Sequence, residues 1–307
     1  MRRASSTVNQ RTPRVGILGL GIMGSIMARA LLQAGHEVVG YDPLPAARSR
    51  LRRSGGQALA SVSEVATHAD VLICSLPSTA ALHAVVADLA QAGRPKVAQM
   101  VIETSTLPLT DKLAAATALR KQGRQMVDAP ISGTATPTPQ QHWIIYLSGT
   151  QAACREAAVL AQAFTLQAPR LGALGAGTKL KLAANHLVAI YNVAYAEMVT
   201  LCRRMGLNPS VALAHMGNSP YIGTGAMRLR MPMMIERSYQ PATMKITLWQ
   251  KDMQIISDMA RSVHCPTPLL DTCGPIYTAA MAMGLGDADT AATAEVLARM
   301  AGDAGAD

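Results

Sequence analysis

Aromatic side chains are scarce in this chain of 307 residues, which contains one Phe and two Trp. The net charge of +9 suggests an acidic partner, but no basic run is interleaved with aromatic residues on which bases could stack. We therefore expect no nucleic-acid partner. An anionic small ligand accounts for the positive charge equally well.

Patterns typical of metal sites and disulfide frameworks are also missing. The five cysteines form no CxxC pair, and the seven histidines form no HxxxH or HExxH pattern. The sequence predicts neither a bound metal nor a set of disulfides.

Long apolar runs are absent as well. The longest apolar stretch, residues 187–199, is interrupted by Asn192 and Glu197, and it is shorter than the roughly 20 residues that span a bilayer. Residues 1–12 are rich in Arg and Ser but have no apolar segment of the kind found in signal peptides. We expect a frayed arm there, no membrane partner and a cytoplasmic location.

Apolar residues themselves are plentiful, at 50% of the chain against 15% charged residues. This composition is typical of a globular protein with large cores. At roughly 100–200 residues per domain, the length favours two domains.

A glycine-rich turn follows the first predicted strand. Residues 14–18 form a short run that is apolar after Arg14, the turn Gly19-Leu-Gly21-Ile22-Met23-Gly24 comes next, and helical spacing continues to Gly35. Glycines at these positions permit the tight turn, the close approach of a pyrophosphate and the packing of helix on strand. The pyrophosphate would lie at the positive end of that helix.

Asp42 ends a second predicted strand, residues 37–41. An acidic residue at this spacing accepts the ribose hydroxyls of NAD and repels the 2′-phosphate of NADP. The competing interpretation is a helix N-cap before Pro43. Four arginines follow, and they are either a solvated basic face or a site for the 2′-phosphate: Arg48, Arg50, Arg52 and Arg53. We expect NAD as the cofactor, with NADP as the alternative.

Strands and helices continue to alternate, with apolar strands predicted at residues 69–76 and 99–103. This order predicts a parallel, doubly wound α/β sheet, that is, a Rossmann fold. Ligands bind beyond the carboxyl ends of such strands, which places Leu76, Pro77 and Thr104–Thr106 at the cofactor crevice. Each segment is also compatible with a plain turn from strand to helix.

Several motifs together resemble the β-hydroxyacid dehydrogenase family, which includes 3-hydroxyisobutyrate dehydrogenase and 6-phosphogluconate dehydrogenase. In the family's order they are the GxGxMG turn at Gly19–Gly24, Asp128-Ala-Pro-Ile-Ser132-Gly133-Thr134, Gly175-Ala-Gly177 with Lys181 and Asn185, Lys251-Asp252, and Gly284–Asp289. The blocks cover nearly all of residues 14–290. The resemblance implies an N-terminal Rossmann domain at 12–175 and an all-α substrate and dimerisation domain at 176–307.

The resemblance also implies roles for individual residues. Ser132 and Gly133 would hold the substrate carboxylate or its neighbouring hydroxyl, and Thr106 would lie beside the nicotinamide. Lys181 would be the general acid/base and Asn185 would orient the substrate, while Lys251 would lie near both nicotinamide and substrate. Thr134 stands where a second Gly is common, and Ala184 stands where many members have a polar residue. These departures bear on which small carboxylate is the substrate.

The spacing of Lys181 and Asn185 independently favours a shared site. Four residues apart on a helix, they project from the same face. Lys179 points elsewhere. The competing interpretation of Lys181 is a lysine that extends along an amphipathic helix to water. A lysine that acts near neutrality needs its pKa lowered by burial or by a nearby cation, and Lys251 could be that cation.

The second half of the chain is predicted to be helical, beginning with one long helix over residues 180–205. Breaks are expected at 208–209, 223–225, Pro232, Pro241 and 265–268. Its many methionines are typical of core or subunit-interface packing. Since family members pair through such helices, a homodimer or homotetramer is expected. Two alternatives to the dehydrogenase are an imine-reducing relative, which typically lacks this lysine, and a non-catalytic NAD(P) sensor.

Overall fold

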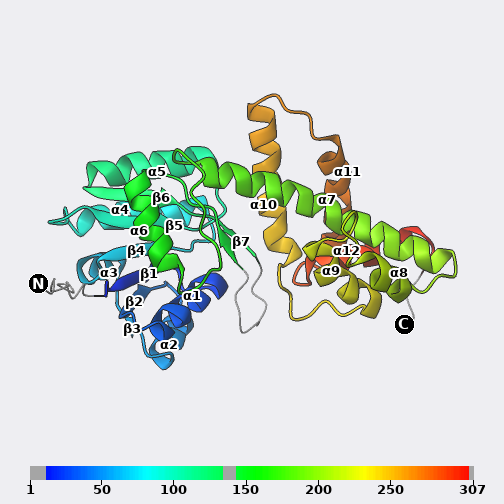
Figure 1. Ribbon diagram of the computed structural model, residues 1–307, viewed down its shortest axis with the longest axis horizontal. Coiled ribbons are helices and arrows are strands. Elements are labelled where there is room, and N and C mark those ends of the chain that lie inside the picture. The colour runs from blue at the N-terminus through cyan, green and yellow to red at the C-terminus, as the bar shows by residue number, and fades with distance from the viewer. Residues whose placement is uncertain (1–11, 134–142, 304–307) are drawn as a thin grey trace, which may run out of the picture. The chain divides into compact units, whose positions relative to one another are not determined.

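The computed structural model describes residues 12–133 and 143–303 (Figure 1). The chain divides into two compact units, and the division falls between Thr178 and Lys179. The N-terminal arm and Thr134, both considered in the sequence analysis, lie outside the described residues.

The first unit is built on a six-stranded parallel sheet in the order β3-β2-β1-β4-β5-β6. Its strands are β1 (Val15–Leu18), β2 (Val38–Tyr41), β3 (Gln57–Ala58), β4 (Val71–Cys74), β5 (Gln99–Glu103) and β6 (Arg124–Asp128). The strand order reverses between β1 and β4, so the crevice for a ligand lies at their carboxyl ends. The predicted Rossmann fold is confirmed.

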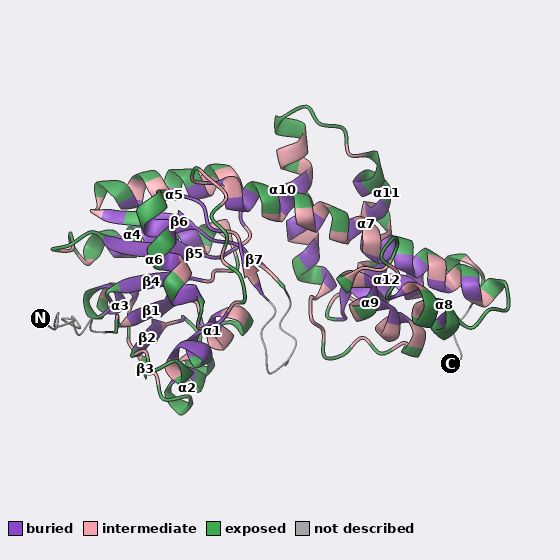
Figure 2. Ribbon diagram, viewed as in Figure 1, coloured by how far each residue is buried: buried purple, intermediate pink, exposed green. Residues whose placement is uncertain are grey.

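Helices cover both faces of this sheet, which explains why its central strands are apolar throughout (Figure 2). They are α1 (Ile22–Gln33), α2 (Pro45–Arg53), α3 (Val62–His68), α4 (Thr79–Gln91), α5 (Leu109–Lys121) and α6 (Gln151–Ala161). Apolar residues of α1, α2 and α6 form the core on one face. Those of α3, α4 and α5 form the core on the other.

A short antiparallel pair, β7 (Ile131–Ser132) and β8 (Ile144–Ile145), follows the sheet. Ile131, Ile145 and Trp143 are buried and belong to the same core as α1 and α6. This packing fixes the backbone on which Ser132 and Gly133 are carried.

The second unit is helical, as predicted, and has two apolar clusters. Its elements are α7 (Ala176–Arg204), α8 (Pro209–Met216), α9 (Gly225–Glu236), α10 (Ile246–Ser262), α11 (Pro268–Ala282), the 3₁₀ turn η1 (Thr290–Ala292) and α12 (Thr293–Met300). The first three residues of α7 belong to the first unit. The expected break at Pro232 is wrong, because α9 continues through that residue. Met227, Met231 and Met234 are buried on one face of α9, so packing along that face outweighs the loss of one backbone hydrogen bond at the proline.

Three findings concern what the described part of the chain does not contain. Within it, no helix is long and apolar enough to cross a membrane. Among the same residues, no group of three His, Cys, Asp or Glu side chains is placed to hold a metal. All five cysteines are free thiols.

Candidate functional site

The glycine turn leads from β1 into the first turn of α1. A Cβ on Gly24 would lie 2.0 Å from the carbonyl oxygen of Gly19, so no larger residue fits there. A Cβ on Gly21 would meet no atom within 4 Å. The space beside Gly21 is therefore open to a ligand, while Gly24 lets helix and turn pack closely.

The first turn of α1 offers uncapped amide donors. Gly21 is the N-cap, no side chain caps the helix, and the first turn has no acidic residue. Ile22 is largely exposed, whereas Met23 is half-buried. An open, positive helix end beside a glycine cradle suits a pyrophosphate, so the residues present fit the dinucleotide.

Asp42 is tied to the same turn. Its Oδ2 accepts a hydrogen bond from the Leu20 amide at 2.8 Å, and its Oδ1 accepts one from the Leu44 amide at 2.9 Å. The interpretation of Asp42 as a helix N-cap is wrong, because α2 begins at Pro45 and Leu44 is its N-cap. Each carboxylate oxygen retains a further lone pair that could accept a ribose hydroxyl.

Two of the four arginines of α2 donate hydrogen bonds to backbone, one after β2 and the other in the glycine turn after β1. Arg48 donates to the carbonyl oxygens of Asp42 and Pro43 and lies over the Tyr41 ring, 5.9 Å from its centroid. Arg50 donates to the Leu20 carbonyl at 3.3 Å. These two side chains bind backbone carbonyls and stabilise the loops that carry them. The interpretation of the arginines as a solvated basic face therefore does not hold for Arg48 and Arg50.

The loops after β4 and β5 are joined to each other. The Ser105 hydroxyl accepts a hydrogen bond from the Leu76 amide at 2.8 Å, and the Thr104 hydroxyl donates to the Cys74 carbonyl at 2.7 Å. Leu76 and Thr106 are half-buried, and Pro77 is exposed. The predicted crevice residues therefore share one braced edge of the sheet.

Ser132 and Gly133 lie at the end of β7. Ser132 is half-buried, and Gly133 is exposed with φ of 145°. A Cβ at Gly133 would lie 2.3 Å from the Trp143 ring, so both the backbone angle and the tryptophan require glycine there. The turn therefore places the Ser132 hydroxyl next to the backbone of Gly133, which no side chain covers.

A buried ionic cluster, Glu103, Lys112 and Asp128, braces the same edge of the sheet. Lys112 Nζ lies 2.7 Å from Glu103 Oε2 and 2.6 Å from Asp128 Oδ1, and none of the three side chains is more than 1% exposed. The two carboxylates end neighbouring strands, since Glu103 pairs with Asp128 in the β5–β6 register. The neighbouring carboxylates raise the pKa of Lys112 despite the opposing effect of burial.

The cluster extends to the first turn of α7. Asp128 accepts hydrogen bonds from the Thr178 amide at 2.9 Å and the Thr178 hydroxyl at 2.7 Å, and Lys112 donates to that hydroxyl at 3.1 Å. Lys112 was missed in the sequence analysis. Its position, three and seven residues before the buried Ala115 and Leu119 of α5, was the sign that it faces the core.

In the second unit, α7 carries Lys181 and Asn185 one turn apart, as their spacing predicted. Lys181 is half-buried and Asn185 is buried, while Lys179 is exposed. The side-chain amide of Asn185 donates to Asp252 Oδ2 at 3.0 Å.

Asp252 contacts both Asn185 and Lys251. It lies buried on α10, and its Oδ1 is 3.0 Å from Lys251 Nζ. Burial lowers the pKa of Lys181, the Asp252 carboxylate raises it, and the Lys251 cation lowers it. Burial and a nearby cation are the two causes expected to lower the pKa of an acid/base lysine.

The structure therefore brings the candidate residues together in two groups. In the first unit, the glycine turn is bonded to Asp42, and the Leu76 loop is bonded to the Thr104–Thr106 segment. In the second unit, Asn185, Lys251 and Asp252 are in contact, with Lys181 one turn before Asn185.

Family comparisons match both units. Residues 14–168 match the NAD binding domain of 6-phosphogluconate dehydrogenase. Residues 175–297 match the family model described as "NAD-binding of NADP-dependent 3-hydroxyisobutyrate dehydrogenase". The two matches cover nearly the whole chain.

Individual relatives are similar along most of their length. The chain is 30% identical to 3-sulfolactaldehyde reductase of Escherichia coli, covering 94% of this chain and 97% of that protein. It is 28% identical to L-threonate dehydrogenase of Cupriavidus necator, covering 92% and 95%. The structure of Mycobacterium tuberculosis 3-hydroxyisobutyrate dehydrogenase with L-serine superposes with a TM-score of 0.83 at 26% identity, covering 94% of this chain and 99% of that one.

Proposed function

The chain belongs to the β-hydroxyacid dehydrogenase family, and from that premise we propose that it oxidises a small β-hydroxy acid with Lys181 as general acid/base. Membership makes it an NAD(P)-dependent dehydrogenase. The relatives differ in their named substrates, which include threonate and sulfolactaldehyde. The proposal therefore concerns the substrate class and the role of the lysine.

The observation that supports this role is the environment of Lys181. Burial and the Lys251 cation both lower its pKa, and a lowered pKa increases the fraction of neutral amine available at moderate pH. The neutral Nζ takes the proton from the substrate hydroxyl during oxidation. In the reverse direction the ammonium returns that proton to the carbonyl oxygen.

Other side chains bind and orient the substrate in this proposal. Ser132 and the Gly133 backbone offer neutral donors to a carboxylate, and Lys251 adds positive charge. Asn185, whose amide nitrogen donates to Asp252 at 3.0 Å, orients the substrate through its side-chain carbonyl oxygen, which accepts from a substrate hydroxyl. Thr134 also belongs to the proposed substrate residues and lies outside the described residues.

The proposed cofactor is NAD in preference to NADP. When bound, the nicotinamide accepts or supplies the hydride. The glycine turn and the first turn of α1 would hold the pyrophosphate, and Leu76, Pro77, Thr106 and Lys251 would border the nicotinamide end. Asp42 is the residue that would favour NAD over NADP, because its carboxylate accepts ribose hydroxyls and repels a 2′-phosphate.

A substrate panel tests the proposal. Initial rates are measured with NAD and with NADP for small β-hydroxy acids, for their amides and for the corresponding alcohols. We expect turnover of the acids and little turnover of the neutral analogues. Equal kcat/KM for an acid and its amide contradicts the proposed carboxylate recognition. Activity confined to imines contradicts the reaction class.

A further inference from the structure

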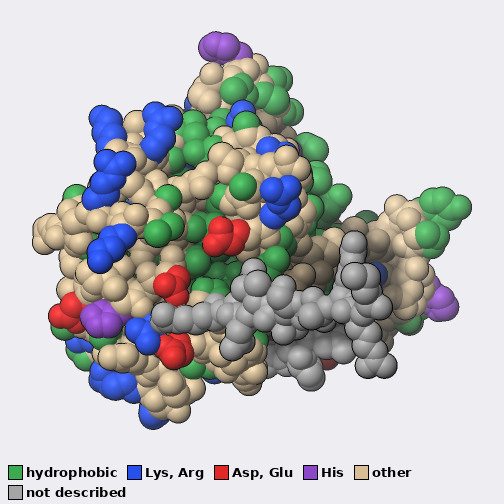
Figure 3. Space-filling view, turned by 60° about the vertical axis from the view of Figure 1, so that its left-hand side comes forward, with side chains coloured by type: hydrophobic (Ala, Val, Ile, Leu, Met, Phe, Trp, Pro, Cys, Tyr) green, Lys and Arg blue, Asp and Glu red, His purple; other side chains and the backbone are tan. Residues whose placement is uncertain are grey.

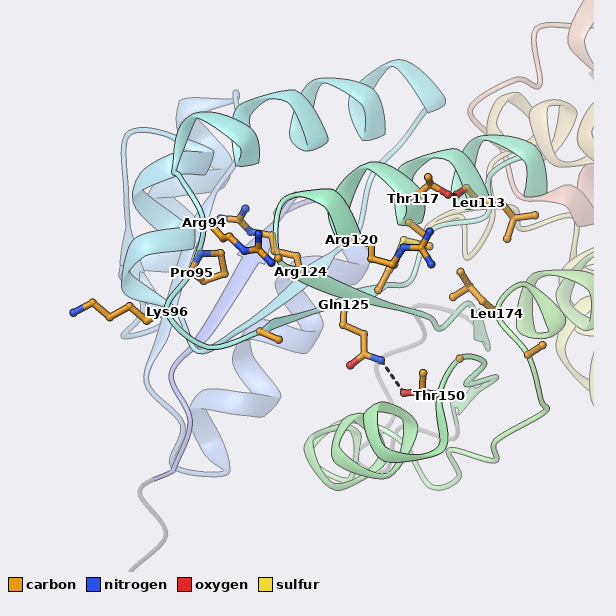
Figure 4. Close-up of a pocket in the computed structure, with 16 residues that line it drawn as sticks. Arg94, Pro95, Lys96, Leu113, Thr117, Arg120, Arg124, Gln125, Thr150 and Leu174 are labelled. Atoms are coloured by element: carbon orange, nitrogen blue, oxygen red, sulfur yellow. Dashed lines mark hydrogen bonds between the residues drawn. The ribbon is translucent and has the colours of Figure 1, made fainter.

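A hollow of about 820 Å³ lies within the first unit, at the amino end of the edge strand β6. Its walls come from the segment before β5, one side of α5, the start of β6, the turn before α6 and residues 173–174. Figure 4 shows these parts surrounding one space. Nothing in the proposed dehydrogenase mechanism uses this region.

The lining of the hollow is basic without any acidic residue. It contains Arg94, Lys96, Arg120 and Arg124, and no Asp or Glu. Within residues 12–133 and 143–303, none of these four cations forms an ion pair. Figure 3 shows Lys and Arg side chains gathered at the upper left of one face, with no Asp or Glu among them.

Arg124 is the most informative of these cations, because it is only 3% exposed. Its guanidinium donates to Gln99 Oε1 at 3.0 Å, to the Gly93 carbonyl at 3.2 Å and to Gln122 Oε1 at 3.4 Å. All three acceptors are neutral. A buried cation whose partners are all neutral retains an uncompensated charge, which an anion would balance.

Arg94 adds a second guanidinium beside Arg124. A Cβ on Gly123, the residue before Arg124, would lie 2.9 Å from Arg94 Cγ and Nε, so the Arg94 side chain packs directly on that glycine. In Figure 4 the Arg94 and Arg124 side chains lie next to each other, while Lys96 points away from them. Two guanidinium groups this close repel each other, and an anion bound between them would relieve that repulsion.

The remaining walls suit an organic anion larger than a simple ion. Arg120 reaches toward the space from the last turn of α5. Thr150, the N-cap of the eleven-residue helix α6, adds a positive helix end. Leu113 and Leu174 supply apolar surface beside the charges.

We propose that this hollow binds an organic phosphate, with Arg94, Arg120 and Arg124 around the phosphate groups and the apolar part against Leu113 and Leu174. Planar guanidinium groups match phosphate geometry in pairs of hydrogen bonds. The site differs from the cofactor crevice, because Arg124 begins β6 whereas Asp128 ends it. Five strand residues place those Cα atoms roughly 13 Å apart.

Calorimetric titration of the full chain tests the proposal. The protein is first loaded with one equivalent of NADH, so that the glycine turn is occupied, and is then titrated with ADP. We expect one ADP per chain. The double variant R94Q/R120Q should bind ADP at least about tenfold more weakly, because two charge-assisted contacts are lost.

The matched control is R155Q, which removes an exposed arginine of α6 outside the hollow and should change ADP affinity by less than about twofold. Circular dichroism must show that both variants remain folded. The absence of ADP binding at millimolar concentration overturns the proposal, as does equal affinity in the double variant. Citrate binding as tightly as ADP overturns the choice of phosphate, and adenosine binding equally well overturns the role of charge.

Discussion

Asp252 holds the side chain of Asn185 through a buried hydrogen bond of 3.0 Å between Nδ2 and Oδ2. The two residues come from different helices, α7 and α10. With its amide nitrogen engaged by a carboxylate, Asn185 is fixed in orientation, and its carbonyl oxygen has a defined direction. Asp252 therefore acts as a positioning residue for Asn185, and its charge raises the pKa of Lys181 against the larger, opposite effect of burial.

The pH dependence of oxidation should report this charge arrangement. The proposed base is the neutral amine, so kcat/KM for oxidation should rise with pH through the pKa of Lys181. That pKa lies below the ordinary 10.5. In Lys251→Gln the neighbouring cation is gone, so the pKa of Lys181 rises and the rising limb of the profile should move to higher pH.

Asp252→Asn should move the same limb in the opposite direction. It removes the carboxylate that raises the pKa of Lys181, while its amide oxygen still accepts a hydrogen bond from Asn185. Lys179→Gln serves as the control, since Lys179 is exposed and its loss should leave the profile in place. Profiles that shift in the same direction for Lys251→Gln and Asp252→Asn refute the assignment of Lys181 as the titrating base.

Cofactor preference should depend on Asp42. In the wild type we expect a lower KM for NAD than for NADP, because the Asp42 carboxylate accepts ribose hydroxyls and repels a 2′-phosphate. Asp42→Ala should reduce the difference between the KM values for NAD and NADP. It should also weaken NAD binding, since the Leu20 amide of the glycine turn loses its acceptor. The measurement is steady-state kinetics with each cofactor, and a lower wild-type KM for NADP contradicts the prediction.

Local sequence patterns sufficed for the glycine turn and for the Lys181–Asn185 face. In both cases the residues concerned lie within one or two helical turns of one another, so backbone geometry alone determines their relationship. The alternation of strands and helices likewise determined the topology of the first unit.

The buried ionic cluster was not predictable in the same way. Glu103, Lys112 and Asp128 lie on three different elements. The pairing of β5 with β6 brings the two carboxylates together, and the packing of α5 on the sheet brings Lys112 to them. Pro232 was misjudged for a related reason, because tertiary burial of the α9 methionines decides whether a helix continues through a proline. The basic hollow is also a product of tertiary structure, since its arginines come from three separate segments.

Stability of the first unit should depend strongly on Lys112. Lys112→Met leaves two buried carboxylates without their cation, and breaking such a buried pair typically lowers the free energy of unfolding by about 3–5 kcal/mol. Lys121→Met, at the exposed end of the same helix, should cost less than about 0.5 kcal/mol. Urea unfolding measures both. In a Trp249→Phe background, Trp143 is the only remaining tryptophan and reports on the first unit.

The pH dependence of this contribution follows from the raised pKa of Lys112. A raised folded-state pKa means that the stabilisation is fully present below the unfolded value of 10.5, and it is lost as the pH rises through the higher folded value. The difference between wild type and Lys112→Met should therefore be constant across neutral pH and shrink only in strong alkali. If the difference in the free energy of unfolding between wild type and Lys112→Met disappears near pH 7, Lys112 is not a buried cation in the folded protein.

Lys181→Ala gives the sharpest test of the mechanism. The glycine turn and Asp42 belong to the first unit, so the variant should bind NADH as the wild type does. Loss of a positioned acid/base typically lowers the rate by about 10²–10⁴, and the loss should fall mainly on kcat because the proton moves only as the transition state forms. Lys179→Ala, two residues earlier and exposed, should stay within a few-fold of wild type. Stopped-flow single turnovers with NAD separate the chemical step from product release. Comparable single-turnover rates in the two variants, with equal NADH affinity, would mean that Lys181 is an ordinary surface-directed lysine and that another group moves the proton.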